Sequence, residues 1–138
     1  MSIKERLKSI LSTLPEGVTL VAVSKFHPVE SIQEAYDAGQ RNFGESRPQE
    51  MAAKYEALPK DIVWTMIGHL QTNKVKLIAP FVSLIASVDS ERLVAEIERQ
   101  AERCERCIDI LLEVHVADEE TKSGWAIDEL RTYIASGA

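Results

Sequence analysis

Short apolar runs alternate with amphipathic stretches over most of the 138-residue chain. Four of the apolar runs have the length of β-strands, and the segment 42–45 is a further short strand candidate. We expect strands at residues 18–24, 42–45, 62–67, 81–88 and 108–116. The first run is apolar without interruption, so its strand is expected to be buried on both faces.

The stretches between these runs carry apolar residues at helical spacing. Pro28 lies where a first helical turn favours proline, and Gly39 follows the expected end of that helix. Ser90 or Asp89 is expected to cap a later helix, and Pro80 to stop a shorter one. Helices are therefore expected at 28–39, 48–58, 72–79, from 90 onward and at 127–134, after an amphipathic N-terminal helix at 1–14.

Strands that alternate with helices predict a parallel sheet, because parallel neighbours need crossover connections, which helices supply. Two α/β architectures fit this order: an open doubly wound sheet, and the first five βα units of an eight-unit TIM-type barrel. Chain length favours the open sheet, since a complete barrel takes about 250 residues. In either case residues 1–138 are expected to form a single domain.

Composition narrows the possible partners. The chain is 45% hydrophobic and 28% charged, with a formal net charge of −6. This balance argues against nucleic acid as a partner, because nucleic-acid surfaces need clustered Lys and Arg. The N-terminal helix has neither the pattern of a signal peptide nor the length of a membrane span. We therefore expect a cytoplasmic protein that binds neither membranes nor nucleic acid.

The two cysteines, Cys104 and Cys107, form a C-x-x-C pattern near the end of a helical run. A redox pair gains its low pKa from the N-terminal end of a helix. A structural zinc site needs two further ligands, and the sequence contains no second cluster of Cys or His. We therefore expect two reduced thiols and no metal site.

Polar residues follow several of the expected strands, where α/β proteins place their functional sites. Lys25 follows the first strand directly, and partial removal from water there would favour the neutral amine that attacks aldehydes. The alternative is a lysine that simply extends into solvent. His69 could act as an acid or base, stack on a cofactor, or help to cap a helix. Glu45 could bind a ligand or form an ion pair with Arg41 or Arg47.

Other polar positions have ordinary structural explanations. His115 fits a strand-end histidine, and Asp89 with Ser90 fits a helix cap. The sequence contains no Walker loop, no dinucleotide-binding glycine motif and no H-E-x-x-H motif. It also offers no convincing cradle for a phosphate group.

Taken together, these segments resemble one family, the YggS/PROSC-type pyridoxal 5′-phosphate (PLP) homeostasis proteins, whose fold resembles the N-terminal barrel of alanine racemase. They occur in the family's order and cover nearly the whole chain. The stretch at 67–74, Ile-Gly-His-Leu-Gln-Thr-Asn-Lys, is the most distinctive. The matching stretches are 21–25, 39–45 with 49–50, 67–74, 87–90 and 120–124.

The resemblance implies a partial (β/α)8 barrel of the alanine racemase N-terminal type, preceded by a helix. Lys25 matches the lysine that holds PLP as a Schiff base in this family. His69 matches a family position near the pocket. The resemblance further implies a cytosolic protein that binds and buffers PLP and related B6 vitamers, without established catalytic turnover.

Three features depart from the family's pattern. Residues 46–48 are Ser-Arg-Pro, where the family usually has Asn followed by an aromatic residue, and His115 replaces a residue that is commonly Asn. The sequence also stops after about five of the family's eight βα units, before the strands that bind the PLP phosphate in the family. We therefore expect weak PLP binding, and unpaired sheet edges through which two copies could form a homodimer.

Two other functions remain open at this point. The chain could be a PLP-dependent enzyme related to racemases, for which His69 is the best available acid or base. It could also be a natural fragment or an engineered chain that keeps the family residues without binding PLP.

Overall fold

The computed structural model describes residues 2–115 and 124–137. Its centre is a sheet of five parallel strands that follow one another in chain order. The strands are β1 (Ala22–Val23), β2 (Asn42–Glu45), β3 (Val63–Met66), β4 (Leu84–Val88) and β5 (Asp109–Leu112). The helices are α1 (Ile3–Leu11), α2 (Val29–Asp37), α3 (Pro48–Ala57), the 3-10 helix η1 (Thr72–Lys74), α4 (Val75–Ile78), α5 (Glu91–Arg103) and α6 (Ile127–Ala135).

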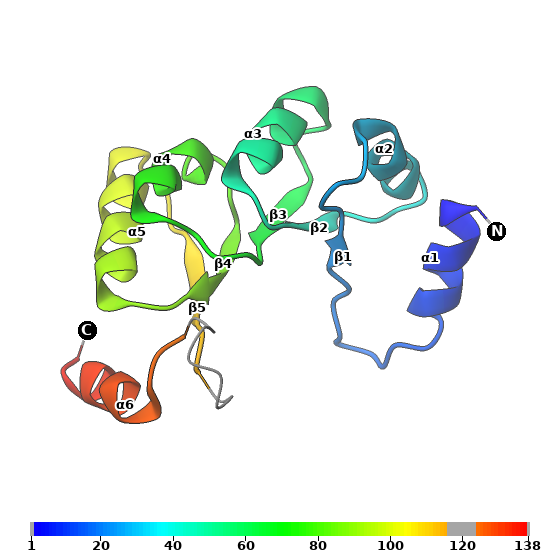
Figure 1. Ribbon diagram of the computed structural model, residues 1–138. Coiled ribbons are helices and arrows are strands. Elements are labelled where there is room, and N and C mark those ends of the chain that lie inside the picture. The colour runs from blue at the N-terminus through cyan, green and yellow to red at the C-terminus, as the bar shows by residue number, and fades with distance from the viewer. Residues whose placement is uncertain (1, 116–123, 138) are drawn as a thin grey trace.

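The order of the strands decides between the two predicted architectures. Helices α2 to α5 lie along one face of the sheet, with α1 beside one end and α6 beside the other (Figure 1). A doubly wound sheet would change direction at a switch point and carry crossover helices on both faces. The unbroken order and the one-sided crossover helices are those of a barrel segment. The partial barrel is therefore confirmed, and the open doubly wound sheet is wrong.

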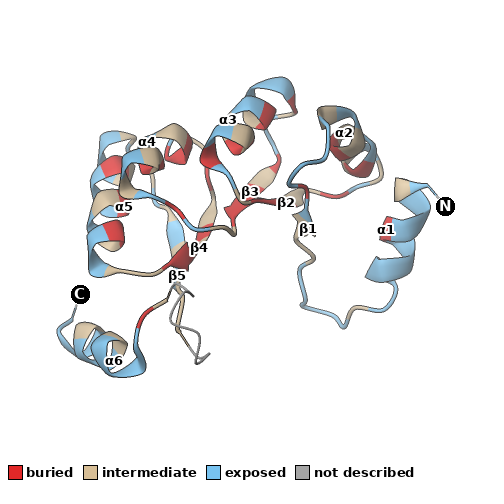
Figure 2. Cartoon of the chain, in the orientation of Figure 1, coloured by how far each residue is buried: buried red, intermediate tan, exposed pale blue. Residues whose placement is uncertain are grey.

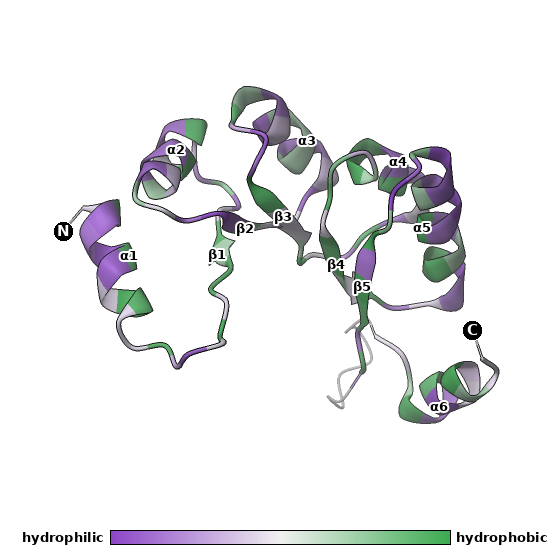
Figure 3. Cartoon of the chain, turned by 180° about the vertical axis from the view of Figure 1, so that it is seen from behind, coloured by the Kyte–Doolittle hydropathy of each residue, from purple (hydrophilic) through white to green (hydrophobic). Residues whose placement is uncertain are grey.

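The hydrophobic core lies between the strands and helices α2 to α5, where the buried positions gather (Figure 2). Trp64 and Ile85 on the strands meet Met51, Val75 and Ile97 on the helices within this core. Seen from behind, β1 and β4 are mainly hydrophobic, whereas hydrophobic and hydrophilic positions share each helix (Figure 3). Each core helix thus buries one side, as its periodicity predicts.

The opposite face of the sheet is open at both edges. On β1, Ala22 packs against the core, but Val23 is 51% exposed. On β5, Leu112 packs against the core, but Leu111 is 55% exposed. The expectation that the first strand is buried on both faces is therefore wrong, because the crossover helices cover only one side of it. Homodimer formation through these edges stays a prediction.

Some element ends also differ from the predicted ones. β1 spans two residues instead of 18–24, and the predicted helix at 72–79 is divided into η1 and α4. α1 ends at Leu11 and is capped by Ser2, whose Oγ accepts a hydrogen bond of 3.1 Å from the Glu5 N–H. Pro28 is the N-cap of α2 and does not lie in its first turn. Gly39, with a φ of 108°, follows this helix as predicted.

Within the described residues, the helices are too short or too polar to cross a membrane. The same residues do not bring together three His, Cys, Asp or Glu side chains that could hold a metal ion. Cys104 is the C-cap of α5, and both it and Cys107 are free thiols.

Candidate functional site

The segments that follow β2 and β3 contact one another and the end of β4 at the carboxyl end of the sheet. Ser87 in β4 donates a hydrogen bond of 2.6 Å from its Oγ to the Gly68 carbonyl. A Cβ atom on Gly68 would lie 2.5 Å from the carbonyl oxygen of Ser46, so this close approach requires glycine. These contacts gather the segments that carry most of the predicted candidates.

Lys25 lies in a tight turn that follows β1. The His27 N–H closes this turn by donating a hydrogen bond of 3.0 Å to the Ser24 carbonyl. Phe26 has a φ of 66°, a backbone conformation that residues other than glycine rarely adopt. Lys25 itself is exposed. The predicted partial desolvation of Lys25 is therefore wrong, and a ligand can reach this lysine from solution.

A buried network of charged side chains lies against the turn. Lys54 in α3 donates to the Ser24 carbonyl at 2.8 Å and to the two Glu45 carboxylate oxygens at 2.9 and 3.1 Å. The Ser24 Oγ also donates to Glu45. The Glu45 side chain is 0% exposed and the Lys54 side chain 7%. Glu45 thus pairs with a lysine, and the predicted arginine partner, Arg41 or Arg47, is wrong.

Glu50 connects this network to the other side of the turn. Its Oε2 lies 2.7 Å from the Lys54 Nζ and accepts a hydrogen bond of 2.8 Å from the Phe26 N–H. Burial alone would raise the pKa of the Glu50 carboxyl, but the hydrogen bonds from Lys54 and Phe26 outweigh burial and hold this pKa below its usual value. Glu50 is therefore an ionised acceptor near neutral pH.

Lys54 is a site residue that the sequence patterns did not single out. Its spacing from Glu50 is that of an i, i+4 pair on one helix face, and both lie in the predicted helix at 48–58. Such pairs are common on solvated helix faces, where they contribute little to stability. Spacing alone could not reveal that a third partner, Glu45, draws this pair into the protein interior.

His69 lies beside Asp89 at the ends of β3 and β4. Its Nδ1 is 3.1 Å from the Asp89 Oδ2, and the two side chains are 60% and 13% exposed. His69 does not cap the following helix, whose N-cap residue is Gln71. Ser90 alone provides the predicted cap of α5, by accepting a hydrogen bond of 3.2 Å from the Leu93 N–H. Asp89 therefore orients an imidazole that remains accessible to a ligand.

Residues 46–48, where the chain departs from the family's pattern, place a cation against the Lys25 turn. The guanidinium carbon of Arg47 lies 4.9 Å from the centroid of the Phe26 ring. Phe26 is 68% exposed, and Pro48 begins α3. Arg47 thus packs on the residue next to Lys25 while its charge stays near solvent.

His115 is half-buried and lies three residues after the end of β5, so its strand-end role stays a prediction. Its N–H donates a hydrogen bond of 2.8 Å to the Trp125 carbonyl. A Cβ atom on Gly124 would lie 2.7 Å from the His115 nitrogen, so the two segments are in close contact. Lys122 and Ser123, which belong to the matching stretch at 120–124, lie outside the described residues.

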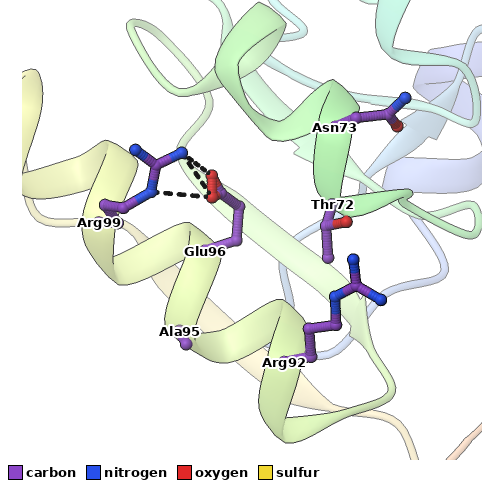
Figure 4. A pocket seen from close by; sticks show the side chains of 6 residues that line it. All are labelled: Thr72, Asn73, Arg92, Ala95, Glu96 and Arg99. Atoms are coloured by element: carbon purple, nitrogen blue, oxygen red, sulfur yellow. Dashed lines mark hydrogen bonds and ion pairs between the residues drawn. The ribbon is translucent and has the colours of Figure 1, made fainter.

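The surface of the described residues has a hollow beside β1 and another beside α5. One, of about 180 Å³ beside β1 and α2, is lined by Ile3, Ala22, Val23, Ser24, His27, Ser31, Ile32 and Phe43. The other, of about 330 Å³ between η1 and α5, is lined by Thr72, Asn73, Arg92, Ala95, Glu96 and Arg99. Figure 4 shows Arg92 pointing toward Thr72, whereas Arg99 is paired with Glu96. Neither hollow is lined by Lys25 or His69, and both of these residues are exposed.

The described residues fit part of what PLP requires. An accessible amine on a fixed turn can form an imine with an aldehyde, and an accessible imidazole can hydrogen-bond to or stack on a pyridine ring. For the phosphate, the described chain offers Arg47 beside the turn but no glycine-rich loop of backbone N–H donors. The described residues therefore provide an accessible lysine for imine formation but a less complete site for the phosphate.

Comparison with known protein sequences identifies a family and several relatives of this chain. Residues 1–137 match the family of alanine racemase N-terminal domains. Pyridoxal phosphate homeostasis proteins of Schizosaccharomyces pombe and Synechocystis are 43% and 41% identical over 78% and 88% of this chain. The matches cover 46% and 57% of those proteins, so the chain spans about half the length of these curated relatives.

Solved structures show the same relationship. PipY of Synechococcus elongatus without PLP has a TM-score of 0.93 at 41% identity, over 98% of this chain and 64% of PipY. PipY with PLP bound has a TM-score of 0.89 at 40% identity, over 98% and 63%. Alanine racemase from E. faecalis, at 20% identity and a TM-score of 0.76 over 97% of this chain and 37% of its own, shares the fold. The chain therefore belongs to the alanine racemase N-terminal domain family, among the pyridoxal phosphate homeostasis proteins.

Proposed function

We propose that this chain binds PLP for PLP homeostasis and that Lys25 holds the cofactor as a Schiff base. The observation that carries the proposal is the position of Lys25, which is exposed in a turn that hydrogen bonds fix on both sides. The PLP-bound structure of PipY supports the choice of cofactor, because its sequence is 40% identical to this chain.

The chemistry required of Lys25 is simple. Its neutral amine attacks the aldehyde carbon, a C=N bond replaces the C=O bond, and one water molecule leaves. The step therefore needs no oxidant, metal or further reactant. His69, oriented by Asp89, is proposed to contact the bound ring, and Arg47 to attract the phosphate.

Binding by this chain is expected to be weak and reversible. Phosphate contacts to backbone N–H groups normally supply much of the affinity for such cofactors, and the described residues contain no loop of that kind. Lys25 is exposed to water, so an unprotected Schiff base at this residue would hydrolyse readily. Covalent trapping is therefore the suitable assay.

The test combines absorbance with trapping. PLP is added to the protein, the visible absorbance band of a protonated Schiff base is recorded, and borohydride then reduces the imine to a stable amine. Peptide mass spectrometry is expected to find the modification mainly at Lys25, and Lys25→Ala to remove the band. Lys76→Ala, at an exposed position on α4, serves as the matched control and should keep the band. An equal band in Lys25→Ala contradicts the proposal.

A second candidate function is racemase-like chemistry, which the contact between His69 and Asp89 favours. An imidazole whose Nδ1 contacts a carboxylate is the usual arrangement of a general base, and the His69 ring is accessible. His69 would take the α-proton of an amino acid and exchange it with solvent. The wild type with PLP is therefore tested for deuterium uptake at the α-carbon of several amino acids in D₂O. Uptake that His69→Gln leaves unchanged, or no uptake at all, excludes this role.

A further inference from the structure

We propose that Glu50 and Lys54 are positioning residues that hold Lys25 in place for imine formation. This inference rests on the proposed role of Lys25. The two residues do not replace that lysine; they act through the backbone of its neighbours, Ser24 and Phe26. Together they restrain the turn from both ends.

Lys54 fixes the end of the turn that precedes Lys25. A lysine ammonium has three N–H donors, and Lys54 directs them to the Ser24 carbonyl, Glu45 and Glu50. The Ser24 side chain also donates to Glu45, so the backbone and the side chain of Ser24 are both attached to the network. All the donor capacity of Lys54 is thus used in holding the turn, and Lys25 is left as the accessible amine.

Glu50 fixes the end of the turn that follows Lys25. It accepts a hydrogen bond of 2.8 Å from the N–H of Phe26, whose φ of 66° is unfavourable for a phenylalanine. A conformation of this kind persists only where the surroundings hold it, and such residues cluster at ligand sites. The Glu50 carboxylate is charged near neutral pH, which makes its bond to Phe26 stronger than a bond between neutral groups.

This restraint matters because the Lys25 side chain is long and exposed. Its four-carbon stem samples many rotamers, and a mobile backbone would widen the range of positions that its amine reaches. Productive attack on an aldehyde needs a defined distance and angle, so fixing the Cα position raises the fraction of productive encounters. The network therefore favours reaction at Lys25 over reaction at other exposed lysines.

Two substitutions of Glu50 distinguish the loss of its negative charge from the loss of its hydrogen bond to Phe26. Glu50→Gln keeps an oxygen that can accept from Phe26, whereas Glu50→Ala removes the acceptor. The Glu50 side chain is 22% exposed, so both variants are expected to fold. Amide hydrogen exchange at Phe26 should become about tenfold faster in Glu50→Ala, as expected for the loss of one hydrogen bond to a charged group, and should accelerate clearly less in Glu50→Gln, which keeps a neutral acceptor. Exchange at Thr65 in the buried part of β3 should be unchanged in both variants and reports that the sheet is intact.

The second readout is the site of borohydride trapping with PLP. The share of the trapped product that lies on Lys25, relative to all lysines, should fall in Glu50→Ala and in Lys54→Met but not in Glu50→Gln. Lys76→Met on α4 is the matched control for removal of a lysine and should not change that share.

The outcomes distinguish the two proposals. If the wild type gives no preference for Lys25, the proposed function fails, and the inference that rests on it fails too. If the wild type prefers Lys25 but Glu50→Ala shows the same share and the same Phe26 exchange, only the positioning role is overturned. Faster Phe26 exchange together with a lower Lys25 share supports it.

Discussion

Lys54 lies 2.9 and 3.1 Å from the two carboxylate oxygens of Glu45, and both side chains are almost completely buried. Removing two charges from water costs several kcal/mol for each, so a buried pair persists only when its remaining hydrogen bonds are also made. Here Ser24 and Glu50 make them. The stability of the pair thus depends on every member of the network.

Replacing Glu45 by leucine is expected to lower the free energy of unfolding by about 3 kcal/mol, because the Lys54 ammonium then stays buried with only Glu50 to balance it. Urea unfolding followed by circular dichroism measures this loss. The double variant Glu45→Leu/Lys54→Met removes both charges and should be more stable than the single variant. The control Glu98→Leu, at an exposed position of α5, should stay within about 0.5 kcal/mol of the wild type. A double variant that is less stable than Glu45→Leu refutes the explanation by buried charge.

Acidification is expected to remove the part of the stability that depends on ionised Glu50. The folded state holds the pKa of this carboxyl below its usual value of 4.5, so the unfolded chain binds the proton more readily. The contribution is complete above the unfolded pKa and is lost as the pH falls through the folded one.

The measurement is the difference in the free energy of unfolding between the wild type and Glu50→Gln. This difference should shrink as the pH is lowered from about 7 to about 3. Asp61 and Glu96 also have lowered pKa values, because Tyr36 and Arg99 donate hydrogen bonds to them, but their effects cancel in the comparison. A difference that stays constant over this range rules out the proposed linkage.

Gly68→Ala is expected to destabilise the fold by about 1–3 kcal/mol, because its Cβ would press on the backbone of Ser46, which cannot rotate away. Gly44→Ala should cost less, since its Cβ would first meet side-chain atoms of Val21 and Ile67 at 3.2 and 3.4 Å. Thermal unfolding of the two variants compares these costs directly. Equal melting temperatures would show that the segments after β2 and β3 can separate without penalty.

Removing the cap of α5 with Ser90→Ala should cost about 1 kcal/mol, because the Leu93 N–H loses its acceptor. Ser90→Asp restores an acceptor and places a negative charge at the N-terminus of the helix, so it should retain most of the stability. Denaturant midpoints and amide exchange at Leu93 report on this contact. Fast Leu93 exchange in Ser90→Asp would contradict the capping role.

The fold could be predicted from the sequence wherever one periodic pattern determined one element. β2 and α3 begin at the predicted residues, and for α3 a proline marks the first turn clearly. The pattern failed at Val18 and Val23, which are apolar but more than half exposed. Burial of a strand depends on what covers each of its faces, and the local sequence does not contain that information.

The candidate site could be predicted less completely. Family resemblance drew attention to Lys25 and His69, and the structure shows both to be accessible at the carboxyl end of the sheet. It could not reveal that Glu45 turns toward α3 and meets Lys54 there. The ion pair joins a strand to a helix. The pattern within each element does not show which residues of the other element it contacts, so this partner can be identified only from the packed structure.

Two indole rings give the protein built-in optical reporters. Trp125 donates a hydrogen bond of 3.0 Å from Nε1 to the Val88 carbonyl, whereas the buried Trp64 Nε1 has no partner among the described residues. Two tryptophans in such different surroundings should emit fluorescence at different wavelengths, and the sequence contains no others. Substituting either one by phenylalanine leaves a single fluorophore, in the core or beside the end of β4. Loss of order in these two regions can thus be followed separately without attaching a label.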